Sequence, residues 1–244
     1  MVNQLRRIGL ILLSTDLTLE QDLVRIHPGA EAIFHITRVP FENPMTPTNL
    51  AALKNELEQA TELLIPGCEL HAIGFACTSG SAVLGYQSVT DSIHSVRPGI
   101  AVTNPVHAGA AGLHALGCQR PAVVAPYPRD VSEKVAEALG GYGLDVPSLT
   151  HLNVADDRDV AAIEPSFLME KVQQAAESDC DSIFIPCTNT PALPIIEALE
   201  ASIGKAVVSA NQGLLWHTLR LAGIPTGLKG FGRLFRYELE VANQ

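Results

Sequence analysis

The stretch AIGFACTSGSAV, Ala72–Val83, sets a cysteine and four small residues directly after a short apolar run. The apolar run, Ala72–Ala76, predicts a buried strand, and we expect the next helix over Ser81–Val96. Cys77 therefore stands where a strand ends and the chain turns into a helix. A nucleophilic side chain at such a junction raises the question of which fold surrounds it.

A second stretch, FIPCTNTP at 184–191, repeats this arrangement in the second half of the chain. It again has an apolar run, a Cys-Thr pair at Cys187 and small polar residues. Each Cys-Thr pair is followed, after a similar interval, by a strand that begins with Ala-Val, at Ala101 and at Ala206. The matching order predicts two similar lobes that each present one cysteine.

Short apolar runs alternate with amphipathic stretches along the sequence, a pattern typical of α/β proteins with parallel sheets covered on both faces. Together with the repeat, it predicts two pseudo-symmetric lobes, each a parallel sheet flanked by helices, with the active-site cleft between them. We expect the lobes over residues 1–118 and 119–244, with a last segment able to cross back. The expected strands are 8–13, 32–39, 72–76, 101–104, 121–126, 146–154, 182–186 and 206–210, and the expected helices are 47–64, 81–96, 106–116, 131–139, 165–176, 191–199 and 213–221.

The composition limits the class of function. Apolar residues make up 47% of the 244 residues and charged residues 17%, which is typical of a folded globular protein. The net charge of −10 and the lack of a basic run argue against nucleic acid as a partner. No stretch approaches the ~20 apolar residues of a membrane span, so we expect no membrane association. Five cysteines without a C-x-x-C motif or a secretory leader are typical of the reducing cytoplasm.

The two Cys-Thr pairs predict a site at the carboxyl ends of the strands, where open α/β sheets bind ligands. A helix N-terminus after each cysteine would favour the thiolate and lower the pKa of the thiol. Thr78, Ser79, Thr188 and Asn189 would add donors for a substrate carboxylate. The remaining cysteines lack this context, and we expect them to pack as small apolar residues.

Two thiols facing each other across a cleft suit two reactions. One thiolate can remove a proton from a carbon while the opposite thiol returns one on the other face, which is racemisation. Alternatively, one thiolate can add to a double bond, allow rotation and leave, which is cis–trans isomerisation. The spacing of the residues is compatible with both racemisation and cis–trans isomerisation.

ACTSGS and PCTNTP, with IGLILLSTD, VVAPYPRDVSEKVAEAL and LNVADDRDVAAIEP, resemble the aspartate/glutamate racemase superfamily over nearly the whole chain. The closest branch is that of the maleate cis–trans isomerases and arylmalonate decarboxylases. The resemblance implies a pair of α/β lobes, no cofactor and no metal. It also implies that Cys77 and Cys187 are catalytic and that Tyr127 binds substrate. Decarboxylases of this branch lack the first cysteine, which favours an isomerase or racemase here.

Two aspartates depart from the pattern of this branch. Asp16 and Asp157 stand where maleate isomerases carry asparagines that hold substrate carboxylates. An ionised aspartate repels a carboxylate and attracts an ammonium group, so a substrate with an amine fits better than maleate. Asp16 can instead tune Cys77, and either aspartate can simply cap a helix or face solvent. Asn189 replaces the histidine of glutamate racemases, which argues against that subgroup.

STDLTLEQDL and ITRVPFENPMTP further resemble racemase-like proteins encoded with ectoine-utilisation enzymes. The sequence thus predicts a cofactor-independent two-cysteine isomerase or racemase for a small dicarboxylate or amino-acid-type substrate, with a role in ectoine catabolism. A maleate cis–trans isomerase proper and a non-catalytic binding protein for small acids are the alternatives. We expect a small carboxylic acid as the partner and a homodimer or higher homo-oligomer as the assembly.

Overall fold

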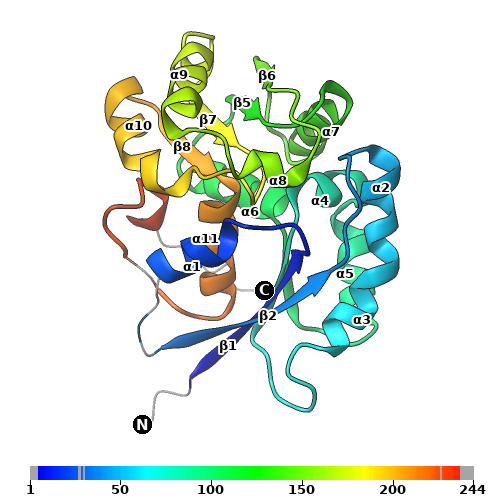
Figure 1. Ribbon diagram of the computed structural model, residues 1–244. Coiled ribbons are helices and arrows are strands. Elements are labelled where there is room, and N and C mark those ends of the chain that lie inside the picture. The colour runs from blue at the N-terminus through cyan, green and yellow to red at the C-terminus, as the bar shows by residue number, and fades with distance from the viewer. Residues whose placement is uncertain (1–4, 27–28, 30, 226, 237–244) are drawn as a thin grey trace.

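The computed structural model describes residues 5–26, 29, 31–225 and 227–236, which form two four-stranded parallel sheets (Figure 1). The strand order is β2-β1-β3-β4 in the first sheet and β6-β5-β7-β8 in the second, so the two sheets have equivalent topologies. The strands are β1 (Arg6–Leu13), β2 (Ala32–Val39), β3 (Ala72–Ala76), β4 (Ala101–Thr103), β5 (Pro121–Ala125), β6 (Leu149–His151), β7 (Ser182–Ile185) and β8 (Ala206–Ser209). The predicted α/β fold with two parallel sheets is confirmed.

Helices flank both sheets (Figure 1). The α-helices are α1 (Leu19–Arg25), α2 (Pro47–Ala52), α3 (Leu57–Glu62), α4 (Thr78–Leu84), α5 (Tyr86–His94), α6 (Pro105–Ala115), α7 (Arg129–Gly140), α8 (Asp157–Val160), α9 (Pro165–Ala176), α10 (Ile196–Ile203) and α11 (Ala210–Leu221). Short 3₁₀ helices are η1 (Leu53–Glu56), η2 (Leu193–Ile195) and η3 (Leu234–Arg236).

The two cysteine stretches follow equivalent inner strands. β3 lies between β1 and β4, and β7 lies between β5 and β8. Every residue of β3 and of β7 is buried, which explains why these strands read as continuous apolar runs rather than alternating ones. The carboxyl ends of the two inner strands therefore carry the Cys-Thr pairs in matching positions.

Helices α6 and α11 are exchanged between the two sheets. α6 follows the first sheet, yet a Cβ at its Gly109 would collide with Phe184 of β7. α11 follows the second sheet, yet its Leu214 and Thr218 lie 3.2 and 3.1 Å from the position of a Cβ on Gly74 in β3. Each half of the chain thus contributes a helix to the other half's sheet. The predicted boundary between the two lobes, at residues 118 and 119, stays a proposal that rests on the sequence repeat.

Several predicted elements differ in their bounds. The helix expected over 81–96 begins at Thr78 and is interrupted at Gly85, whose φ of 79° is not helical. The helix expected over 47–64 is divided into α2, η1 and α3, and the strand expected over 146–154 is limited to β6. α1 and α8 were not predicted, because neither is long enough to show a helical period.

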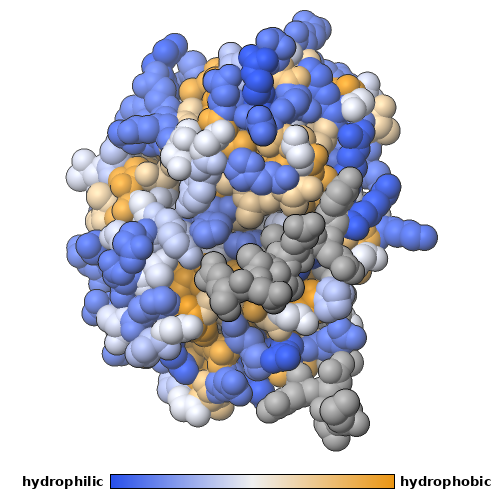
Figure 2. All heavy atoms as spheres, turned by 180° about the vertical axis from the view of Figure 1, so that it is seen from behind, coloured by the Kyte–Doolittle hydropathy of each residue, from blue (hydrophilic) through white to orange (hydrophobic). Residues whose placement is uncertain are grey.

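The surface and the core are well separated. Seen from behind, hydrophilic side chains predominate on the surface, and hydrophobic residues show as smaller patches between them (Figure 2). Trp216 on α11 is fully buried, with the guanidinium of Arg220 4.7 Å from its ring centre. Among the described residues, none of the helices has the length and apolar character needed to cross a membrane.

Candidate active site

Cys77 directly follows β3 and caps helix α4. Its Sγ accepts a hydrogen bond from the backbone N–H of Gly80 at 3.2 Å, and the hydroxyl of Ser79 lies 3.7 Å from the same sulfur. A Cβ at position 80 would stand 2.9 Å from the sulfur, so glycine leaves the room this contact needs. The helix N-terminus predicted at the first cysteine is therefore present.

Cys187 follows β7 by two residues and has a different local structure. Its φ of 79° lies in the left-handed region, which is rare for a residue with a side chain and common at functional sites. Residues 188–190 form a turn, and the next helical residue is Leu193 of η2. The expectation that a helix begins directly at the second Cys-Thr pair is thus wrong, because a turn separates this pair from the next helical residue.

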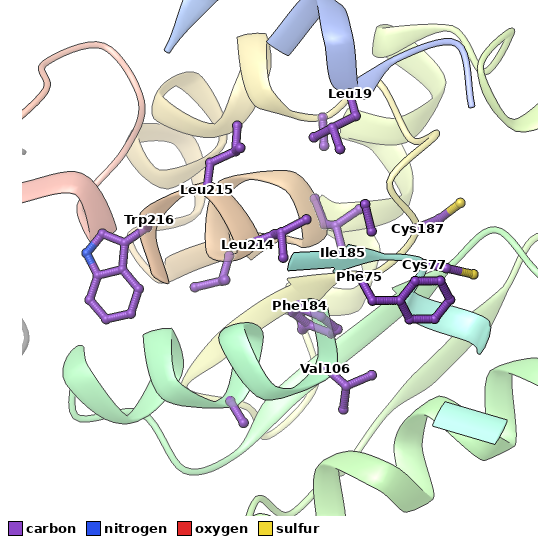
Figure 3. Packing of buried hydrophobic residues seen from close by; sticks show 14 of the residues in the cluster. Leu19, Phe75, Cys77, Val106, Phe184, Ile185, Cys187, Leu214, Leu215 and Trp216 are labelled. Atoms are coloured by element: carbon purple, nitrogen blue, oxygen red, sulfur yellow. The ribbon is translucent and has the colours of Figure 1, made fainter. Parts of the chain in front are cut away.

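The two thiols lie close to each other in the interior. Figure 3 shows both directed to the same side, one from the end of each inner strand. Cys77 is 2% exposed and Cys187 is 5% exposed. Burial raises the pKa of Cys77 to about 12 and that of Cys187 well above its usual value, and the Asp157 carboxylate adds to both shifts. The expected lowering of the thiol pKa is wrong for this state, because burial outweighs the amide hydrogen bonds.

The two carboxylate oxygens of Asp16 differ in their hydrogen bonds. Oδ1 accepts from the backbone N–H groups of Thr18 and Leu19 at 3.0 and 2.9 Å, so it caps the start of α1. Oδ2 is buried and makes no hydrogen bond with the described residues, since the nearby Thr188 hydroxyl donates to the Ala76 carbonyl instead. Burial raises the pKa of this carboxyl, while its hydrogen bonds and Arg38 oppose the rise. The helix-capping role holds for Oδ1, and Oδ2 is left available for a donor.

Asp157 begins α8 and faces the second cysteine. Its Oδ2 accepts from the hydroxyl of Thr15 and, at 3.0 Å, from the amide of Asn189. Its Oδ1 lies 3.9 Å from Sγ of Cys187, within reach of the thiol proton. Burial raises the pKa of Asp157 to about 6, with nearby Asp16 acting in the same direction. An alternative in which this aspartate points to solvent does not hold, since only 4% of the residue is exposed.

The threonine of each Cys-Thr pair braces the other pair. The Thr78 hydroxyl oxygen accepts from the N–H of Cys187 at 3.1 Å, and the Thr188 hydroxyl donates to the carbonyl of Ala76 at 3.2 Å. Asn189 is also fully engaged. Its amide nitrogen donates to Asp157 and to the Thr15 carbonyl, and its amide oxygen accepts from the N–H of Leu17. These side chains first build the site, and their contact with a substrate stays a prediction.

Tyr127 follows β5 and is fully buried beside the thiols. Burial raises the pKa of its hydroxyl well above the usual value, and Cys187 and Cys77 are near enough to act in the same direction. The Cys187 thiol and the Thr78 hydroxyl lie near this hydroxyl, but none of the described residues forms a hydrogen bond of good geometry with it. A buried hydroxyl without a partner points to a group supplied by a ligand.

Some residues of the site were missed from the sequence. The side-chain oxygen of Asn43 accepts from the N–H of Asp157, and the N–H of Met45 donates to the carbonyl of Ala155, so the loop after β2 reaches the second lobe. Thr15 lies in the quoted STD motif, but a lone threonine beside an aspartate gives no distinct signal. The described residues include no cluster of three or more histidine, cysteine or acidic side chains suited to a metal ion.

Comparisons with known proteins identify the family. A family model described as arylmalonate decarboxylase matches residues 57–235. The maleate isomerase of Nocardia farcinica is 31% identical over 248 residues, which covers 97% of this chain and 98% of that protein. The arylmalonate decarboxylase of Bordetella bronchiseptica is 32% identical over 127 residues, about half of each chain (51% and 53%).

Solved structures of the same family also match this chain. A cysteine-to-serine variant of the Nocardia farcinica maleate cis–trans isomerase, with a covalently bound succinylcysteine intermediate, matches with a TM-score of 0.83 at 31% identity, covering 95% of this chain and 98% of that chain. A maleate isomerase variant from Pseudomonas putida S16 with maleate has a TM-score of 0.84 at 23% identity, with coverages of 96% and 98%, and so shares the fold. This chain belongs to the family of the maleate isomerases and arylmalonate decarboxylases, within the aspartate/glutamate racemase superfamily.

Proposed function

We propose that this enzyme is a cofactor-independent isomerase in which Cys77 and Cys187 act together on a small dicarboxylate or amino-acid-type substrate. The observation that carries the proposal is the pair of thiols at the ends of equivalent strands, directed to the same side (Figure 3). The arylmalonate decarboxylase branch is disfavoured, because its members lack the first cysteine and this chain has Cys77.

Asp157 is the base that we assign to Cys187. Its Oδ1 is 3.9 Å from the sulfur, and its pKa of about 6 leaves it ionised yet basic near neutral pH. Transfer of the thiol proton to this carboxylate would create a thiolate beside a neutral acid. Because the free thiols are buried and their pKa values are raised, we expect the thiolate to form only when a substrate is bound.

Two reaction courses fit this arrangement. In racemisation, one thiolate takes the α-proton and the opposite thiol delivers a proton to the other face of the carbanion. In cis–trans isomerisation, a thiolate adds to the double bond, the new single bond rotates, and elimination of the thiolate restores the alkene. The succinylcysteine intermediate of the Nocardia farcinica enzyme is of the kind that the second course forms.

Asp16, more than Asp157, favours a substrate with a hydrogen-bond donor, because both oxygens of Asp157 already face partners. The buried, unpartnered Oδ2 of Asp16 can accept a hydrogen bond and, when ionised, would repel a carboxylate. An ammonium group, or another donor on an amino-acid-type substrate, satisfies this oxygen. Racemisation of an amino-acid-type compound is therefore our first candidate, and the STDLTLEQDL resemblance supports a role in ectoine utilisation.

Maleate isomerisation is the second candidate. It is favoured by the 31% identity to the Nocardia farcinica maleate isomerase over almost the full length. In this case the raised pKa of Asp157 and of Asp16 would let a protonated carboxyl donate to a substrate carboxylate. The two candidates therefore differ in the protonation state of these aspartates and in the bond that changes.

One experiment distinguishes the candidates. The protein is incubated with aspartate, diamino acids and maleate in deuterated water and followed by NMR. Deuterium at Cα of an amino acid without loss of maleate selects racemisation, and fumarate from maleate selects cis–trans isomerisation. Cys77→Ser and Cys187→Ser should each lose activity, whereas Cys68→Ser, an exposed cysteine outside the site, should not. Binding without exchange or isomerisation would instead favour a non-catalytic binding protein.

A further inference from the structure

The turn after Cys187 is held by helix α11, which packs on the other sheet. The carbonyl of Thr188 accepts a hydrogen bond from Nδ2 of Asn211 at 2.8 Å. Asn211 is 1% exposed and lies in the first turn of α11, the helix that crosses to the other sheet. Because Cys187 has a left-handed backbone, a fixed carbonyl on the next residue limits how the turn can relax.

The amide of Asn211 joins this carbonyl to a buried carboxylate. Nδ2 also donates to Oδ2 of Asp22 at 2.8 Å, so both of its hydrogens are used. The opposite amide orientation would set the Asn211 oxygen against two acceptors, so the hydrogen bonds themselves determine the orientation. A bond to a carboxylate is stronger than one to a neutral oxygen, and it holds the amide in place for Thr188.

Asp22 lies in α1, and the two residues that directly precede this helix contact the same turn at a second point. The N–H of Leu17 donates to Oδ1 of Asn189 at 2.7 Å, and the Thr18 hydroxyl donates to the Asn189 carbonyl at 2.9 Å. Both residues that follow Cys187 are therefore tied to the α1 segment. Asp22 itself is fully buried, and its other oxygen accepts from Arg25 at 3.1 Å.

We propose that Asp22, acting through Asn211, is a positioning residue that holds the Thr188 carbonyl and with it the left-handed conformation of Cys187. The pair touches neither thiol, so it acts on the direction of Cys187 and not on the chemistry. Burial raises the pKa of Asp22 to about 6, with Asn211 and Arg25 opposing and Asp16 adding to the rise. The carboxylate that the amide needs is thus present at neutral pH. The importance of this role for turnover rests on the proposed function.

The test uses thiol modification, which needs no substrate. The full-length protein is treated with iodoacetamide, and the rates at Cys187 and Cys77 are compared within each sample by peptide mass spectrometry. Loss of the positioning pair frees the turn, so Asp22→Leu and Asn211→Leu should raise the Cys187-to-Cys77 ratio at least about fivefold. Asp22→Asn keeps an acceptor oxygen for Asn211 and should stay near the wild-type ratio.

A matched control separates positioning from loss of stability. Thr218→Val removes a fully buried hydroxyl in the same helix α11, where Oγ1 donates to the Leu214 carbonyl, and does not touch the turn. It should leave the ratio unchanged. If Asn211→Leu does not fold, Asn211→Ser replaces it, because its short side chain cannot span both acceptors. An unchanged ratio in folded Asn211 and Asp22→Leu variants, or an equal rise in Thr218→Val, would overturn the proposal.

Activity provides the second measurement. Once a substrate is known, Asp22→Leu should lower kcat about tenfold or more and leave KM within about twofold, since the pair orients a thiol without binding substrate. If the thiol ratio rises and no isomerase activity exists in any variant, the positioning role stands and the proposed function fails. If activity exists and the ratio does not change, the positioning role fails alone.

Discussion

The hydroxyl oxygen of Thr78 accepts a hydrogen bond from the backbone N–H of Cys187, at 3.1 Å. The residue after the first cysteine thus holds the second cysteine, although the two come from different sheets. The reverse contact is present too, since Thr188 donates to the carbonyl of Ala76 directly before Cys77. The threonine in each Cys-Thr pair is therefore explained by the hydrogen bond that it makes to the backbone of the other lobe. Together the two hydrogen bonds fix the positions of the two cysteines relative to each other.

Replacement of Thr78 by valine tests how much this hydrogen bond contributes to stability. Valine has the same shape but no acceptor, so the buried N–H of Cys187 loses its partner at a cost of about 1–3 kcal/mol in unfolding free energy. Chemical denaturation measures the change. Thr78→Ser retains the hydroxyl and should recover most of the loss. A Thr78→Val protein as stable as the wild type would show that this N–H is satisfied in another way.

The exchanged helices give a prediction about packing. Gly109 of α6 lies against the Phe184 ring, so Gly109→Ala forces a shift of a buried aromatic ring and should destabilise the protein by about 1–3 kcal/mol. Gly140→Ala, at the end of α7 with open space around the new methyl group, should change stability by less than about 1 kcal/mol or increase it. Thermal unfolding of the two variants compares them directly. Equal melting temperatures would contradict the close approach of α6 to β7.

The strands and the paired cysteines were predictable because buried parallel strands leave continuous apolar runs, and because the Cys-Thr pair recurs in equivalent units. The left-handed turn at Cys187 was not predictable, since it depends on Thr78 and Asn211, which are remote in sequence. The thiol pKa values were missed for a related reason. A helix N-terminus is visible in a sequence, whereas complete burial of Cys77 is a property of the assembled lobes.

The role of α1 was also hidden from the sequence. Its seven residues, LEQDLVR, are too few for a clear helical period, and Asp22 reads as an ordinary surface charge. The structure buries this aspartate against α11 because α11 crosses to the first sheet. The crossing leaves a sequence trace in small residues: Gly213 of α11 lets this helix approach the backbone of α6, and Gly109 of α6 makes room for Phe184 of β7.

The buried thiols give a prediction for the free enzyme. Cys68 is exposed, whereas the pKa of Cys77 is raised to about 12 and that of Cys187 is also raised. Alkylation near neutral pH should therefore modify Cys68 first, with Cys77 and Cys187 slower by at least about a hundredfold, because thiolate and access are both lacking. Intact-mass kinetics of the wild type and of Cys68→Ser measure this. Rapid modification of Cys77 in the Cys68→Ser protein would contradict the closed, thiol-protonated state.

The raised pKa of Asp157 predicts a pH-dependent effect on stability. Its pKa is about 6 in the folded protein, against 3.8 for an unperturbed aspartate, chiefly because burial disfavours the charge. Between these values the folded state holds more protons than the unfolded state, so the contribution of Asp157 to stability falls as pH rises through this window and is constant above it. Asp157→Asn removes that loss and keeps an acceptor for Thr15 and Asn189.

The stability of Asp157→Asn relative to the wild type should therefore increase by on the order of 1–3 kcal/mol between about pH 3.5 and about pH 7. Asp159→Asn, an exposed position in the same helix, is the control for removing a carboxylate from α8. A flat difference for Asp157→Asn would mean that folding does not raise the pKa of Asp157, which removes the pKa argument for its role as the base for Cys187.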